Sequence, residues 1–146
     1  MKSRHHAREL ALMTLYAFDF NNELSEETNF VEFPTLSVEE EAKLDVDTKM
    51  FARYLVLGTI ENLNEIDKMI SHFSINRPLE KIDRIDRNIL RLSLFSLLHM
   101  KNIHKNIVIT EAVRLSQEYS RQMNYKFING ILDSIEKELD DYIKDS

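Results

Sequence analysis

DRIDRNILRLSLFSLLHM, residues 83–100, is the strongest helical pattern in the sequence. Its apolar residues fill most of one helix side and more, and no glycine or proline interrupts them. They are Ile85, Ile89, Leu92, Leu94, Phe95 and Leu98. Asp83 and Asp86 fall in the first turn, where carboxylates complement the helix dipole. We therefore interpret these acids, like Glu39–Glu41, as stabilising a helix start and not as a metal or acid–base site.

The N-terminal segment is a second clear helix. Residues 4–20 contain good helix formers and no breaker, and apolar residues from Leu10 to Phe18 cover most of the circumference. This pattern predicts a buried central helix. Its first turn is the polar exception, and three side chains there are expected to project into water: Arg4, His5 and Arg8.

The segment that follows is an acidic connection. Residues 21–36 are irregular and include Pro34, so we predict a loop. Ser37-Val38-Glu39-Glu40 is typical of a capping box, in which Glu40 reaches back to the Ser37 amide. The helical pattern after it continues to about Phe73, with a bend or break expected near Asn62–Asn64.

The C-terminal part contains two further predicted helices, residues 107–120 and 124–143. A boundary at Arg77-Pro78 precedes the central pattern, because a residue before proline avoids the helical region. A polar turn at 101–106 follows it. The last helix is apolar at helical spacing, and a short tail is expected at 141–146.

Glycine, proline and cysteine are scarce, with counts of two, two and zero in 146 residues. Tight turns of β proteins and phosphate-binding loops both depend on glycine, so the composition favours an all-α fold and argues against nucleotide-dependent chemistry. Both glycines fall inside helical patterns, which we explain by close helix–helix approach. The absence of cysteine excludes disulfides and cysteine nucleophiles, and is compatible with a reducing cytoplasm.

The net charge of −6 argues at first against nucleic acid as a partner. Its distribution matters more than its sum. Residues 23–50 carry nine acidic and two basic residues, whereas residues 51–135 carry nine acidic and twelve basic residues. A local RNA-binding face is therefore compatible with the sequence. We find no apolar run long enough for a membrane span and no secretory signal.

No catalytic set emerges from the sequence, so we predict a binding protein without enzymatic activity, cofactor or metal. His5 and His6 are adjacent and point about 100° apart on a helix, so they cannot easily share a metal. The remaining histidines lack partners at the spacing of zinc peptidases. We interpret all five as solvated or capping residues; the other three are His72, His99 and His104.

Two constellations combine cations with aromatic rings, as single-stranded RNA binding requires. The first is the basic N-terminal turn, Lys2 to Arg8, with Tyr16 two turns further along the same helix. The second is the segment 125–130, YKFING, which places Lys126, Phe127 and Asn129 at the start of the last helix. From spacing alone, the basic N-terminal turn is equally compatible with an ordinary solubilising terminus. Phe127 in the second group is likewise compatible with ordinary core packing.

Three segments together resemble the NusB family of bacterial transcription antitermination factors. RHHARELALMTLYAFD (4–19) is similar to the family's opening helix, and IDRNILRLSLFSLLHM (85–100) is similar to its central helix. ITEAVRLSQEYS (109–120), followed by YKFINGILD (125–133), resembles the most specific family signature. The order and spacing agree over about residues 3 to 140.

The resemblance implies a compact bundle of about seven helices in two packed subdomains, forming one domain over residues 1–146. It implies binding to boxA RNA of ribosomal RNA leader transcripts together with NusE, a small-subunit ribosomal protein. It further implies a cytoplasmic role in the antitermination complex of RNA polymerase, promoting read-through of terminators.

The RNA-binding role carries over to matching positions of this sequence, which are Arg4, His5, His6, Arg8, Tyr16, Lys126, Phe127 and Asn129. Two of the expected cations are histidines here, which are mostly neutral at pH 7. A further departure is Thr110, where the family frequently has asparagine. The candidates for NusE contact are Asp86 and Arg87, with Glu111 third.

Two alternatives remain from the sequence. A helical adaptor or dimerisation module that binds only protein would agree with the negative charge. An N-terminal domain of ribosomal RNA cytosine methyltransferases shares the fold group, but we find neither a methyl-donor domain nor a cysteine nucleophile. Homodimerisation stays open.

Overall fold

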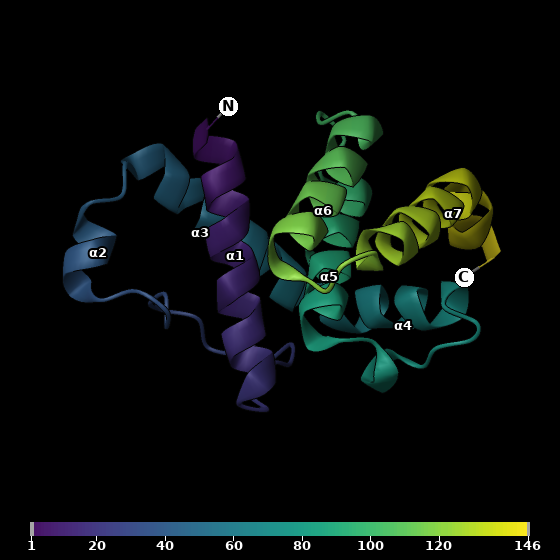
Figure 1. Ribbon diagram of the computed structural model, residues 1–146, viewed down its shortest axis with the longest axis horizontal. Helices are drawn as coiled ribbons and strands as arrows, with labels where there is room; N and C mark the ends of the chain where they lie inside the picture. The colour runs from purple at the N-terminus through teal and green to yellow at the C-terminus, as the bar shows by residue number, and fades with distance from the viewer. Residues whose placement is uncertain (1, 146) are drawn as a thin grey trace.

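The structure, a computed structural model, describes residues 2–145, with side chains at 4–139 and 141. The described chain is all-α and contains seven α-helices, which confirms the predicted fold class (Figure 1). Their bounds are α1 (Lys2–Phe20), α2 (Val38–Ala42), α3 (Val46–Glu61), α4 (Leu63–Phe73), α5 (Arg84–His99), α6 (Lys105–Tyr119) and α7 (Asn124–Asp145), with a short 3-10 turn, η1 (Leu79–Lys81).

Helix α5 is the centre of the molecule. It packs against α1 and α3 on one side and against α4, α6 and α7 on the other (Figure 1). Every residue from Asn88 to Leu98 is buried. The expectation of a buried central helix from Leu10 to Phe18 holds only in part, because Leu12 and Leu15 are buried whereas Tyr16 and Phe18 remain partly exposed. Both segments are rich in apolar side chains, and α5 is the central helix because α1, α3, α4, α6 and α7 all pack against it.

The predicted helix boundaries are largely confirmed. The Ser37 hydroxyl accepts the Glu40 N–H at 3.0 Å, and the Glu40 carboxylate accepts the Ser37 N–H at 2.9 Å, which completes the capping box. The long pattern breaks at Asn62, as expected. An additional break precedes α3, because the Asp45 carboxylate caps that helix by accepting the Thr48 N–H at 2.7 Å. The final helix extends to Asp145, through the predicted tail.

The two glycines have different surroundings. A methyl group added to the α-carbon of Gly58 would lie 2.0 Å from Cζ of Phe95, so α3 and α5 approach closely there, as predicted. Gly130 has no atom within 4 Å of the corresponding position. The explanation by close helix approach is therefore wrong for Gly130, which lies on the exposed side of α7.

A charged network around Asp19, at the end of α1, joins this helix to α5 and α4. Its carboxylate accepts two hydrogen bonds from Arg87, at 2.8 and 2.9 Å, and one each from Asn88 and Arg91, at 2.9 Å. Arg91 donates further to Asp67 on α4 at 2.8 and 3.1 Å. Partial burial opposes ionisation, but these donors hold the pKa of Asp19 below its ordinary value. The network pairs charges that α5 would otherwise bury alone.

None of the helices within residues 2–145 is long and apolar enough to cross a membrane.

Candidate nucleic-acid interface

The basic turn of α1 presents one cation to solvent and holds a second one inside. Arg4 is exposed, and its guanidinium carbon lies 3.9 Å from the centroid of the Phe51 ring on α3. Arg8 is only 8% exposed and lies against the same ring at 5.5 Å. Burial lowers the pKa of Arg8, whereas nearby Glu111 raises it and Arg4 lowers it further. The expectation that Arg8 projects into water is wrong, because α3 covers it. The Lys2 side chain is outside the described residues.

His5 is also buried, contrary to the sequence prediction, because its ring points between α1 and α6. Its Nδ1 lies 2.9 Å from a carboxylate oxygen of Glu111, and its Nε2 lies 3.1 Å from one of Glu118. His6 points outward, with 61% of its side chain exposed, and its Nδ1 lies 3.6 Å from Glu9. The interpretation of every histidine as solvated or capping therefore fails for His5. It holds for His104, whose ring nitrogen accepts the Asn106 N–H at 3.0 Å.

Tyr16 lines a surface hollow of about 620 Å³ between α1, the start of α5 and the end of α6. The ring is half-buried and stacks on Phe20, with 6.1 Å between the ring centroids. The hollow combines apolar walls with two arginines and two tyrosines. Its lining consists of Met13, Tyr16, Asp83, Arg84, Ile85, Tyr119, Ser120 and Arg121. Such a mixture of stacking rings and cations suits a base with its phosphate.

A second hollow, of about 570 Å³, lies between the end of α4 and the start of α7. Exposed Lys126 and half-buried Phe127 both line it. The Arg77 guanidinium covers the Phe127 ring at 4.5 Å from the centroid. Asn129 is exposed on the same helix, outside the lining. This arrangement again places cations beside an aromatic ring.

The two predicted constellations remain separate surfaces. The hollow at Tyr16 and the hollow at Phe127 share no lining residue, and none of the described contacts joins the Arg4–Arg8 turn to residues 126–129. Sequence reasoning missed the residues that complete both hollows, which are Arg77, Arg84, Tyr119 and Arg121. Arg77 and Arg121 lie in connections between helices, where periodicity gives no direction. Only the folded chain brings them beside Phe127 and Tyr16.

The three predicted partner-binding residues are engaged within the chain. Asp86 is completely buried and accepts a hydrogen bond from Asn124 at 2.7 Å. Its burial raises the pKa of its carboxyl group above the ordinary value. The prediction of a surface contact by Asp86 is therefore wrong, since this residue fastens the start of α7 to α5. Arg87 is paired with Asp19, and Glu111 with His5.

Comparison with known proteins gives a consistent result. A sequence model described as the NusB family matches residues 5–137. The chain is 37% identical over 142 residues to the transcription antitermination protein NusB of Thermodesulfovibrio yellowstonii, covering 92% of each chain. Its fold matches that of T. maritima NusB with a TM-score of 0.79 and 32% identity, covering 92% of this chain and 91% of the other.

A further solved structure contains antitermination factors NusB and NusE in complex with dsRNA. It matches with a TM-score of 0.78 and 29% identity, covering 94% of this chain and 98% of the matched chain.

Proposed function

The chain belongs to the NusB family, and from this premise we propose that it is a transcription antitermination factor that binds boxA RNA together with NusE. The observation that carries the proposal is the family match over residues 5–137, together with relatives that are covered over nearly their full length. One matched structure contains NusB, NusE and RNA, which supports both ligands. The chain then acts by binding and not by catalysis, in the cytoplasm, as part of the antitermination complex of RNA polymerase.

The N-terminal surface supplies the first set of RNA contacts in this proposal. Arg4 and His6 are exposed at the start of α1 and reach the phosphate backbone. Tyr16 offers its ring to a base in the hollow that it lines with Arg84 and Arg121. His5 and Arg8 are buried below this surface and act by fixing the turn against α3 and α6.

The start of α7 supplies the second set. Lys126 contacts a phosphate, the Phe127 ring supports a base or sugar, and Asn129 offers an amide for hydrogen bonding. The supporting observation is the hollow beside Phe127, into which Arg77 brings an additional cation. Because the two hollows are separate, the RNA must extend across the surface between them.

NusE binds, in our proposal, along a surface that includes Arg87 at the start of α5 and Glu111 in the middle of α6, which lie beside opposite ends of α1. Arg87 and Glu111 retain 13% and 20% side-chain exposure there, so both contribute to the surface while holding their internal partners. Asp86 contributes indirectly by fixing the α7 start through Asn124.

A fluorescence-anisotropy titration tests RNA recognition directly. A boxA RNA is compared with a scrambled RNA of the same length, at fixed salt, with NusE present. We expect tighter binding of boxA RNA, and we expect Arg4→Ala to weaken it while Lys68→Ala, which removes an exposed lysine on α4, does not. Absence of RNA binding would favour the protein-only adaptor instead.

A further inference from the structure

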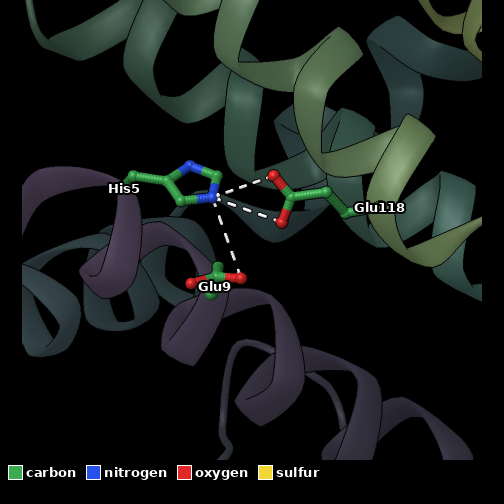
Figure 2. A group of neighbouring side chains, drawn as sticks. All are labelled: His5, Glu9 and Glu118. Carbon is green, nitrogen blue, oxygen red and sulfur yellow. Dashed lines mark hydrogen bonds and ion pairs between the residues drawn. The ribbon is translucent and has the colours of Figure 1, made fainter. Parts of the chain in front are cut away.

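His5, Glu9 and Glu118 form a compact cluster between α1 and α6 (Figure 2). His5 and Glu9 are one helical turn apart on α1, and Glu118 reaches them from the last turn of α6. One ligand atom of each residue lies within 4.8 Å of the other two. The side chains are 11%, 22% and 35% exposed, so the cluster is sheltered yet open to solvent on the Glu118 side.

The distances match the separation of ligands around a small metal ion. The Nε2 of His5 lies 3.1 and 3.3 Å from the two oxygens of Glu118, and 3.7 Å from an oxygen of Glu9. Tetrahedral zinc, with ligand bonds near 2.1 Å, separates its ligands by about 3.4 Å. One N–H cannot point at all three oxygens, whereas a cation between them contacts every one.

The other ring nitrogen of His5 is already committed. Its Nδ1 lies 2.9 Å from Glu111, so a proton on Nδ1 is donated to that carboxylate. The lone pair of a neutral ring then lies on Nε2, facing the carboxylates of Glu9 and Glu118. This carboxylate–histidine arrangement is the one that orients metal-binding histidines in proteins.

The surrounding charges also favour a cation. Three carboxylates converge on one imidazole, from Glu9, Glu111 and Glu118. Among the described side chains, Arg114 pairs with Glu118 at 3.1 Å, and Arg8 interacts with Glu111 over a longer distance. The Tyr119 hydroxyl donates to Glu9 and so orients it toward the cluster. An imidazolium is the competing way to balance these charges.

We propose that His5, Glu9 and Glu118 bind a divalent transition-metal ion of the zinc class, with Glu111 holding His5 in the ligating orientation. One imidazole nitrogen with carboxylate oxygens suits zinc, and water completes the coordination. The ion would connect α1 to α6. It would also lie directly beneath the turn that carries Arg4 and His6. The proposal is independent of the RNA-binding role.

The experiment is a metal titration of the full, tag-free chain after treatment with a chelator. Zn²⁺ binding is measured by calorimetry, and Co²⁺ serves as a spectroscopic probe of the ligand set. We expect saturation at one equivalent and a higher melting temperature with Zn²⁺. Glu118→Gln should weaken Zn²⁺ binding by at least about tenfold to a hundredfold. Losing a residue that only orients a ligand has an effect of that size, and Glu118 is proposed as a ligand itself. His5→Gln should abolish it.

His99→Gln is the matched control, because His99 lies near a carboxylate of Glu65, at 3.8 Å, outside the cluster. It should bind metal as the unmodified chain does. Glu118 is partly exposed, so Glu118→Gln decides the question even if His5→Gln fails to fold. The proposal is overturned if the chain shows no saturable binding, as an imidazolium would predict. Equal affinity in Glu118→Gln and the unmodified chain would overturn it as well.

Discussion

Replacing Asp19 by asparagine should destabilise the fold more than any surface change, because this carboxylate joins α1 to α5. It accepts four hydrogen bonds, from Arg87, Asn88 and Arg91, and only 12% of the side chain is exposed. Asparagine keeps the shape but removes the charge and presents an N–H₂ group to donors. Breaking a buried ion pair on one side costs about 3–5 kcal/mol, so we expect a loss of about 3 kcal/mol in the free energy of unfolding.

Urea unfolding at pH 7, followed by circular dichroism, measures the loss. Asp133→Asn is the matched control, because Asp133 pairs with Lys137 on α7 at 3.2 Å with both side chains more than half exposed. It should cost less than about 0.5 kcal/mol. A loss below about 1 kcal/mol for Asp19→Asn, or an equal loss for both variants, would refute the assignment of Asp19 as the connection between α1 and α5.

The same network predicts a pH dependence. Burial opposes ionisation of Asp19, but its donors from Arg87, Asn88 and Arg91 lower the pKa in the folded state. The ionised carboxylate therefore stabilises the fold fully above the unfolded value of about 3.9, and this contribution is lost as the pH falls through the folded pKa. The stability difference between the unmodified chain and Asp19→Asn should shrink in acid below about pH 4. A stability difference between the two proteins that stays constant down to pH 2 would contradict a lowered pKa of Asp19 in the folded state.

Three further predictions concern helix packing, RNA contact and the hydrogen-bonded phenol of Tyr119. Gly58→Ala should lower the free energy of unfolding by about 1–3 kcal/mol, because its methyl group would overlap the Phe95 ring. Gly130→Ala should be neutral or stabilise the fold by up to about 1 kcal/mol, because nothing lies near its added methyl group. Equal effects of the two substitutions in thermal unfolding would contradict this. Lys126→Ala should reduce the salt dependence of RNA binding by about one phosphate contact without changing the melting temperature, and an unchanged slope would remove this contact. Desolvation first, and then the hydrogen bond to the Glu9 carboxylate, raises the pKa of Tyr119 to about 12; ultraviolet titration against Tyr119→Phe should show almost no phenolate from this residue at pH 10.5, and its appearance there would count against the hydrogen bond to Glu9.

The sequence predicted the helices well because their signals are local. Each of these signals acts over a few residues. Examples are the apolar periodicity of residues 83–100, the capping box at Ser37 and the proline at 78. Local sequence signals did not show which helix lies at the centre of the bundle. Residues 10–18 and 83–100 are both rich in apolar side chains, and only the packing of the other helices makes α5 the central one.

The candidate site was predicted less completely, because exposure depends on which helix covers a given turn. The sequence placed His5 and Arg8 in water, but α6 and α3 cover them. Arg121 lines a hollow with Tyr16 although the two are 105 positions apart. One local signal was available and overlooked: His5 and Glu9 stand four residues apart on a predicted helix. Their third partner, Glu118, comes from a distant helix.

The most direct test of the central claim is the affinity of the chain for boxA RNA with and without NusE, measured by filter binding over a range of salt concentrations. We predict weak binding by the isolated chain, markedly tighter binding when NusE is present, and a loss of affinity as salt rises. Equal affinity with and without NusE would contradict joint recognition of the RNA, and absence of RNA binding in both cases would contradict the proposed function itself.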